Sequence, residues 1–206
     1  MLSRREVLLF IPLLALASDE AASLTLAQVR GRLREPKTLV ADFVQRRSLK
    51  GIKQPLLSRG RVALEKGRGV LWDQTSPFLQ RMTVTPGRVE IELEGRKTAE
   101  VIPVTDARAK AFAGLIEGVL AGDFSLLEKH FRVESVKALP EERWSLELVP
   151  LEAGLSRAFS RVGIAGGAVV ESLTLLSPAG EKTAIEFSRI RTDEPLPAES
   201  LARLAR

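Results

Sequence analysis

Strict alternation of aliphatic and charged residues is the feature that most constrains the fold of this chain. Residues 88–95 read RVEIELEG, where three glutamates alternate with Val89, Ile91 and Leu93. Because successive side chains of a β-strand point to opposite faces, this segment predicts a strand with one apolar and one charged face. The apolar face must be covered, either by the protein's own core or by a ligand.

Similar short segments recur along the 206 residues, separated by turn-forming Gly and Pro. Strands are predicted at residues 38–49, 56–66, 70–74, 79–85, 88–95, 131–136, 144–149, 158–164, 168–177 and 182–191. Helices are predicted at residues 24–33 and 106–121. A sheet this wide twists and curls toward a barrel. The pattern therefore predicts an α+β fold: one large curled antiparallel sheet of nine to eleven strands, forming an unclosed half β-barrel, with inserted helices.

The predicted helix at 106–121 has an apolar stripe that includes Phe112, Leu115, Ile116 and Val119. Asp106 is a suitable N-cap and Gly122 a suitable stop. This stripe could lie as a lid across the apolar concave face of the sheet.

Two glycines, Gly114 and Gly118, lie inside that helix, and each costs about 1 kcal/mol relative to Ala. The helix is therefore either packed very closely or held only loosely. A weakly held lid over a half-open barrel suits a long aliphatic ligand, whereas a closely packed one suits a plain core. The residues alone leave both readings open.

The first 17 residues have the pattern of an export signal. Arg4 and Arg5 precede an apolar run at residues 7–17, which ends in the small-x-small sequence Ala15-Leu16-Ala17. We expect cleavage near Ala17, a single domain over residues 18–206, and a periplasmic location if the source is a double-membrane bacterium. The arginine pair also resembles a twin-arginine signal, so the export route stays open.

Composition argues against several other functions. The chain has no cysteine, which excludes disulfides, a lipid-modified cysteine and thiol catalysis. Its net charge of +5 comes from cations mixed with carboxylates, and no basic run is interleaved with aromatics, so we expect no nucleic-acid binding. His130 is the single imidazole, and no metal-ligand or nucleophile motif accompanies it. We therefore expect no enzyme activity, no metal and no cofactor.

Several segments are similar to those of a known family. Residues 39–47, LVADFVQRR, and residues 58–78, with Gly60, Trp72 and Pro77 at matching places, resemble the first strand and the tryptophan hairpin of the LolA family of periplasmic outer-membrane lipoprotein carriers. Residues 115–134 resemble its central helix and following strand, and residues 144–150 a later strand. Lys66-Gly67 stands where the family has Arg-Pro, and Pro86-Gly87 where it has Asp-Gly, which indicates a divergent member.

The resemblance implies an unclosed barrel with a helical lid that binds acyl chains and carries them from the inner to the outer membrane. It also implies an acylated lipoprotein or lipid cargo, an inner-membrane ABC-type releasing complex and an outer-membrane acceptor. We expect a monomer. A sensing or regulatory module of similar fold, without transport, is the alternative.

On this reading the sheet and the lid both contribute to an acyl-chain cavity. Lys66 would contact the lid in place of the family's arginine, as a point charge without the guanidinium fork. The predicted cavity residues are Leu39, Phe43, Val70, Trp72, Val89, Ile91, Leu93, Phe112, Leu115, Ile116 and Val119.

Overall fold

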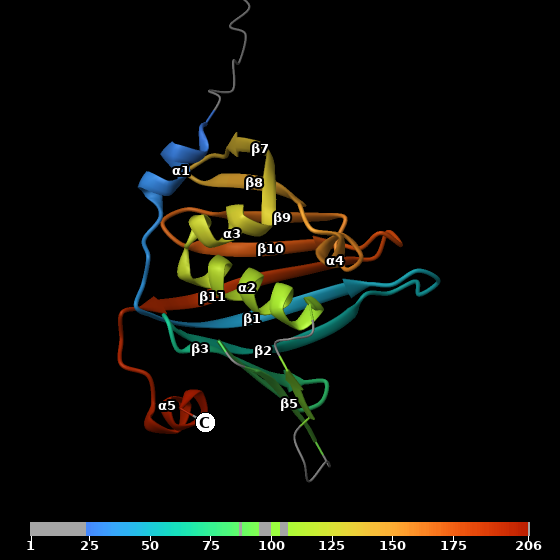
Figure 1. The fold of residues 1–206 in the computed structure, drawn as a ribbon, viewed down its shortest axis with the longest axis vertical. Coiled ribbons are helices and arrows are strands. Elements are labelled where there is room, and N and C mark those ends of the chain that lie inside the picture. The colour runs from blue at the N-terminus through green and yellow to red at the C-terminus, as the bar shows by residue number, and fades with distance from the viewer. Residues whose placement is uncertain (1–23, 87, 95–99, 104–106, 206) are drawn as a thin grey trace, which may run out of the picture.

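An antiparallel sheet of eleven strands, with helices on one of its faces, makes up most of the computed structural model (Figure 1). The structure describes residues 24–86, 88–94, 100–103 and 107–205. The elements are α1 (Leu26–Arg32), β1 (Thr38–Ser48), β2 (Leu56–Glu65), β3 (Gly69–Ser76), β4 (Gln80–Thr85), β5 (Arg88–Leu93), β6 (Glu100–Pro103), α2 (Ala107–Ala121), α3 (Phe124–His130), β7 (Phe131–Ala138), β8 (Trp144–Pro150), α4 (Ala153–Ser156), β9 (Arg161–Gly166), β10 (Val170–Leu176), β11 (Lys182–Thr192) and α5 (Ala198–Leu204).

The strand order shows two meanders joined in the middle of one sheet. The order is β6-β5-β4-β3-β2-β1-β11-β10-β9-β8-β7, so every neighbour is adjacent in sequence except β1 and β11. That pair joins the first strand to the last, with Phe43 opposite Phe187. β6 and β7 form the two edges and are not paired with each other, so the sheet stays open. The prediction of an α+β fold with a curled, unclosed antiparallel sheet is confirmed.

The alternation seen in the sequence sets which face is buried. In β1, Leu39, Ala41 and Phe43 are buried, and β8 alternates in the same way along its whole length. These inward residues form one core cluster with α2, which lies across the face that we call concave (Figure 1). Leu115, Ile116 and Val119 of α2 are each at most 1% exposed. This half of α2 is therefore part of the hydrophobic core.

The start of α1 and the end of α2 each have a local capping signal. In α1, Thr25 and Gln28 form a capping box. α2 ends at Gly122, whose φ of 66° is left-handed. The N–H of Asp123 donates to the Gly118 carbonyl at 3.0 Å and that of Gly122 to the Val119 carbonyl at 3.3 Å, which is a Schellman motif. The stop at Gly122 is confirmed, whereas Asp106 and the export signal at 1–17 lie outside the described residues.

The sequence pattern gave no separate prediction for α3, α4 or β6. α3 has seven residues and α4 only four, too few for a clear helical period. In α3, Phe124 and Leu127 are both buried, and Phe124 meets the ring of Trp144 edge to face. Tertiary packing therefore stabilises a helix that is too short to form alone.

The C-terminal helix α5 covers part of the opposite, convex face of the sheet (Figure 1). Leu196 and Leu204 form a second buried cluster there with Ala63 and Leu71. Arg203 places its guanidinium on Asp73 of β3, with N–O distances of 2.7 and 2.9 Å, and reaches Thr83 of β4 at 3.3 Å. This bidentate pair between a guanidinium and a carboxylate attaches α5 to the sheet.

Replacing Arg203 tests this attachment. We expect Arg203→Ala to lower the free energy of unfolding by about 1–2 kcal/mol, because two charge-assisted hydrogen bonds are lost. Arg203→Lys should retain only part of the lost stability, since an ammonium group cannot form two parallel hydrogen bonds to the Asp73 carboxylate. Urea unfolding followed by circular dichroism measures the change. Arg191→Ala, which removes an exposed pair with Glu194, is the control and should cost less than about 0.5 kcal/mol. Equal losses in the two variants would contradict a special role for Arg203.

The two glycines inside α2 differ in their surroundings and give a matched pair of variants. A Cβ at Gly114 would meet nothing within 4 Å, whereas one at Gly118 would lie 3.0 Å from Leu127 Cδ2 and 3.1 Å from its Cγ. We expect Gly114→Ala to stabilise the protein by about 1 kcal/mol through helix propensity. Gly118→Ala should gain less or lose stability, because the buried Leu127 must move. Thermal and urea unfolding of both variants would reveal the difference, and equal gains would contradict close packing at Gly118.

Candidate functional site

A cavity of about 580 Å³ opens on the concave face, where the β1–β2 hairpin and the β3–β4 turn extend beyond the core. Its described lining comes from β1, β2, β3, β4, β10 and β11, mostly from inward positions, and from the two connections. The lining residues are Gln45, Arg47, Pro55, Leu56, Leu57, Ser58, Trp72, Gln74, Pro77, Phe78, Gln80, Met82, Leu175 and Ile185. Strands from both meanders therefore meet around one space.

Three aromatic rings lie together between this cavity and the buried core. The centroid of Trp72 lies 4.2 Å from that of Phe43 and 6.2 Å from that of Phe187. Phe43 pairs with Gly60 across the strands, and a Cβ there would lie 2.8 Å from the Phe43 ring and 2.0 Å from the Asp73 carbonyl oxygen. Glycine at position 60 therefore makes room for the rings. They form a rigid apolar floor for the cavity.

The wall and rim combine apolar surface with a few polar groups. Met82, Leu175 and Ile185 are buried, whereas Leu56 and Phe78 at the rim are about half exposed. A cavity of mostly apolar surface with a few polar groups has the usual composition of a small-molecule binding site.

Gln74 is the buried polar residue of this site. It is 8% exposed, and its Nε2 donates to the carbonyl of Phe78 at 3.1 Å. This bond holds the β3–β4 turn, and with it the Phe78 side chain, against the cavity. Arg47 lies at the same end of the sheet, with its guanidinium 3.8 Å from the carboxylate of Glu181.

The structure places the predicted cavity residues in two groups. Trp72 lines the cavity and Phe43 lies directly behind it. Leu39, Val70 and Val89 are buried in the core together with Leu115, Ile116 and Val119 of α2. Ile91 and Leu93 are half-buried on the inward face of β5, and the side chain of Phe112 lies outside the described residues. The α2 residues Leu115, Ile116 and Val119, which were predicted to form a lid, therefore pack in one core with the strand residues.

Lys66 hydrogen-bonds a carboxylate. Its Nζ lies 2.6 Å from Glu35 Oε2, and this hydrogen bond raises the pKa of Lys66 above its ordinary value, with the charge of Asp123 adding to the effect. Asp123 lies two residues after Ala121, the last residue of α2, so Lys66 lies near that end of the helix. Direct contact between Lys66 and the lid stays a prediction. His130, at the end of α3, has its Nδ1 2.7 Å from Glu152.

Several cavity residues escaped the sequence-based prediction. Met82 and Ile185 lie in predicted strands, and their alternation assigns them to an apolar face. Leu175 lies in the predicted strand at 168–177 and Gln74 in that at 70–74, yet no sequence signal marks the end of the sheet at which they meet. Their common position follows from the β1–β11 pairing, which brings residues more than a hundred positions apart onto one wall.

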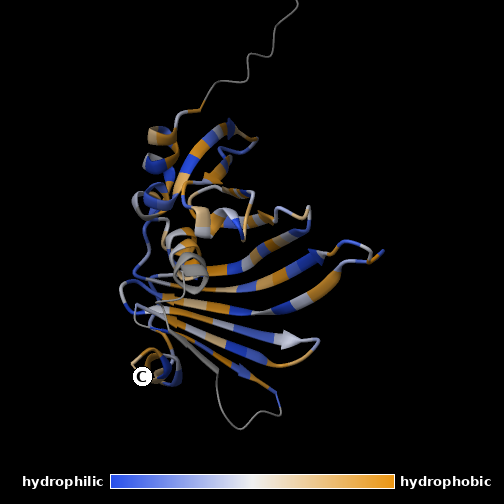
Figure 2. Cartoon of the chain, turned by 45° about the vertical axis from the view of Figure 1, so that its right-hand side comes forward, coloured by the Kyte–Doolittle hydropathy of each residue, from blue (hydrophilic) through white to orange (hydrophobic). Residues whose placement is uncertain are grey.

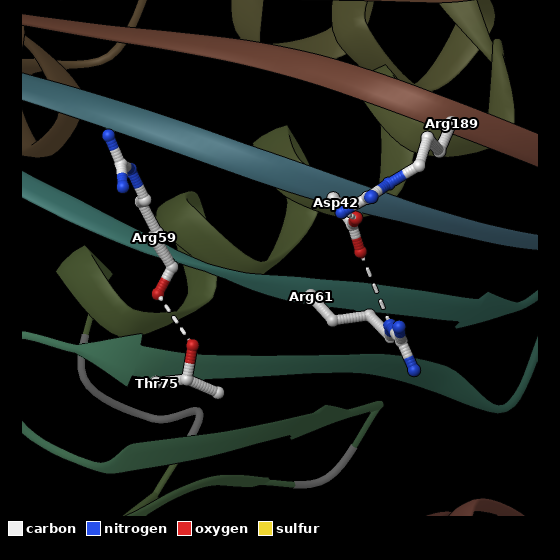
Figure 3. A network of polar contacts seen from close by, with 5 residues as sticks. All are labelled: Asp42, Arg59, Arg61, Thr75 and Arg189. Atoms are coloured by element: carbon white, nitrogen blue, oxygen red, sulfur yellow. Dashed lines mark hydrogen bonds and ion pairs between the residues drawn. The ribbon is translucent and has the colours of Figure 1, made fainter.

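A second groove, of about 530 Å³, lies on the convex face over β11, β1, β2 and β3. Figure 3 shows Asp42 between Arg61, whose Nε donates to Oδ1 at 3.3 Å, and Arg189, which forms an ion pair with Oδ2. Arg189 has a left-handed φ of 51° where the β1–β11 register shifts. The Thr75 hydroxyl donates to the carbonyl of Arg59 at 3.3 Å. Asp42 thus holds two cations at the irregular part of the strand pairing, which is a structural role.

Metal sites and membrane-spanning helices were sought in the part of the chain that the structure describes. No group of three or more His, Cys, Asp or Glu residues there is placed to hold a metal ion. None of the described helices is both long enough and apolar enough to cross a bilayer.

Two curated proteins and one solved structure are among those to which this chain is similar. An "Outer-membrane lipoprotein carrier protein" of Dechloromonas aromatica is 25% identical over 171 residues, covering 83% of this chain and 79% of the relative. One of Methylococcus capsulatus is 25% identical over 189 residues, covering 90% and 86%. The solved structure of a putative outer membrane lipoprotein-sorting protein domain from Vibrio parahaemolyticus is 13% identical, covering 87% of this chain and 97% of that domain, with a TM-score of 0.49.

The sequence profile of a protein family covers most of the chain. Residues 17–172 match the family described as outer membrane lipoprotein carrier protein LolA-like, which is well over half of the 206 residues. Lys66-Gly67 and Pro86-Gly87 mark it as a divergent member. The chain belongs to the LolA-like family of outer membrane lipoprotein carrier proteins.

Proposed function

We propose that this protein binds the acyl chains of lipoproteins, or of another long-chain lipid, in the concave-face cavity and carries them between membranes. The observation that supports this most directly is the apolar cavity of about 580 Å³ with its aromatic floor and open rim. The names of the curated relatives in Dechloromonas aromatica and Methylococcus capsulatus agree with it.

The energetics of hydrocarbon in water explain why such a cavity is needed. Each CH₂ group removed from water is worth about 0.8 kcal/mol, so exposing one 16-carbon chain costs roughly 12 kcal/mol. A free acyl chain therefore does not leave a bilayer at a useful rate. A protein that shields it during transit removes that barrier.

Release requires that the protein can also refill the space itself. The second half of α2 already covers the closed end of the concave face with Leu115, Ile116 and Val119. We propose that α2 acts as a lid: a chain too long for the cavity displaces it, and its return helps to expel the cargo. Competition of this kind keeps binding reversible.

The proposal extends to location and partners. The protein would act in the periplasm after removal of residues 1–17, receive its cargo from an inner-membrane ABC-type complex and deliver it to an outer-membrane acceptor. The family membership supports this route, in which a soluble monomer meets both membranes in turn.

Filling the cavity tests the binding site. Ser58 is a small inward residue of β2 that lines it, so Ser58→Trp should occupy the space without removing core contacts. We expect the wild-type chain from Ser18 to bind a fluorescent fatty acid saturably and Ser58→Trp to lose at least tenfold in affinity, about 1.4 kcal/mol. The control is Ser145→Trp, at an outward position of β8 that lines a separate groove, which should bind as the wild type does.

Two outcomes of that titration would contradict the proposal. The first is an absence of saturable binding by delipidated wild-type protein. The second is an equal loss in Ser58→Trp and Ser145→Trp, since the site would then not be this cavity. Circular dichroism spectra and thermal unfolding of each variant show that the fold is retained.

Chain length should separate cavity binding from lid displacement. Short acyl chains fit the cavity as it stands, whereas long ones require α2 to move. We therefore expect hydrogen–deuterium exchange of the α2 amides to rise with long-chain ligands and to stay unchanged with short ones. Protection of α2 by ligands of every length would show that it is a fixed part of the core.

A further inference from the structure

The β1–β2 hairpin, residues 46–59, is the most exposed apolar feature in the described part of the chain. Among the described residues, five large apolar side chains are strongly exposed: Ile52 (49%), Leu56 (49%), Leu57 (43%), Phe78 (51%) and Leu151 (57%). The first three belong to this hairpin, and Phe78 lies in the β3–β4 turn on the other side of the cavity mouth. Figures 1 and 2 show the hairpin extending beyond the neighbouring strand ends.

The same hairpin has a strongly one-sided charge. Between Phe43 and Leu64 the sequence contains Arg46, Arg47, Lys50, Lys53, Arg59 and Arg61 and no Asp or Glu. Some of these cations have partners on other strands: Arg46 pairs with Glu186, and Arg47 lies near Glu181. Lys50 and Lys53, in the connecting loop, are exposed and make no ion pair with any described residue.

We propose that this hairpin docks on the surface of an anionic phospholipid bilayer. Lysines and arginines are attracted to the headgroups of an anionic leaflet, and neighbouring aliphatic and aromatic side chains enter the boundary between headgroups and acyl chains. Ile52 lies between Lys50 and Lys53 at the tip, so both contributions act at one place. An acid-free basic loop complements a uniformly anionic surface such as a leaflet rich in phosphatidylglycerol.

Docking in this way places the cavity mouth next to the lipid. Leu56, Leu57 and Phe78 are both exposed and part of the cavity rim. A hairpin seated in the headgroup region would bring that rim to the bilayer, so that an acyl chain could pass between the two without crossing open water. This consequence depends on the proposed carrier function, whereas bilayer binding itself does not.

Vesicle flotation tests the docking directly. The chain from Ser18 should float with vesicles of phosphatidylcholine and phosphatidylglycerol, much less with phosphatidylcholine alone, and less as salt increases. We expect Lys50→Gln/Lys53→Gln to weaken binding by about fivefold per lysine, roughly 25-fold together. The matched control is Arg132→Gln/Lys137→Gln on the edge strand β7, which removes the same charge elsewhere and should retain binding.

Site-specific labelling shows which segment touches the lipid. Because the chain has no cysteine, Ile52→Cys carries a single environment-sensitive dye. Its emission should shift to the blue with anionic vesicles, whereas the dye at Ala138→Cys on β7 should not shift. Equal shifts, equal losses in the two charge variants, or no flotation by the wild type would overturn the proposal. If the hairpin binds only a protein partner, the wild-type protein will not float with the vesicles.

Fatty-acid titration of the same variants separates the two proposals. Lys50→Gln/Lys53→Gln should keep wild-type affinity for a soluble fatty acid, because neither lysine lines the described part of the cavity. Flotation without acyl-chain binding would support the docking hairpin and refute the carrier function. Acyl-chain binding without flotation would support the carrier function and refute the docking hairpin.

Discussion

Pairing of the first strand with the last is the interaction on which the rest of this structure depends. β1 and β11 run antiparallel over most of their lengths and join two meanders that would otherwise be separate sheets. This pairing is long-range, because about 140 residues separate Phe43 from Phe187, and it must therefore be stabilised by side-chain packing. The aromatic contacts of Trp72 with both phenylalanines strengthen the joint on the concave side. On the convex side Asp42, held between Arg61 and Arg189, supports the irregular register.

The open form of the sheet then determines what the concave face can do. Since β6 and β7 do not pair, the strands cannot close around a filled core of their own side chains. The second half of α2 and the short helix α3 cover part of the face, with Gly118 allowing the two helices to approach closely. The β1–β2 and β3–β4 ends extend past this core and enclose the cavity. An open sheet with a helix across it thus leaves a cavity at one end of its concave face as a consequence of its topology.

Charged side chains have different roles in the body of the sheet and in the β1–β2 hairpin. The carboxylates of Asp73 and Asp42 each hold an arginine in a structural pair, at α5 and at β11 respectively. The loop lysines of the β1–β2 hairpin have no such partner among the described residues and lie beside exposed aliphatic side chains. The net charge of the whole chain is only +5, yet the β1–β2 hairpin at the mouth of the cavity is both strongly basic and apolar.

The sequence by itself determined the local elements and the class of fold. The alternation at Val89, Ile91 and Leu93 and the helix stop at Gly122 depend on neighbouring residues only, so they could be predicted directly from the sequence. Motif resemblance pointed to the LolA-like family, which the family comparison confirmed.

The tertiary structure alone decided the rest. Leu39, Val70 and Val89 share the periodicity of Trp72, yet they lie under α2 while Trp72 faces the cavity. Period-two patterning assigns a residue to a face of the sheet, but its position along that face relative to a helix depends on contacts between distant segments. Met82, Leu175 and Ile185 meet for the same reason, through the β1–β11 pairing, which no local signal encodes.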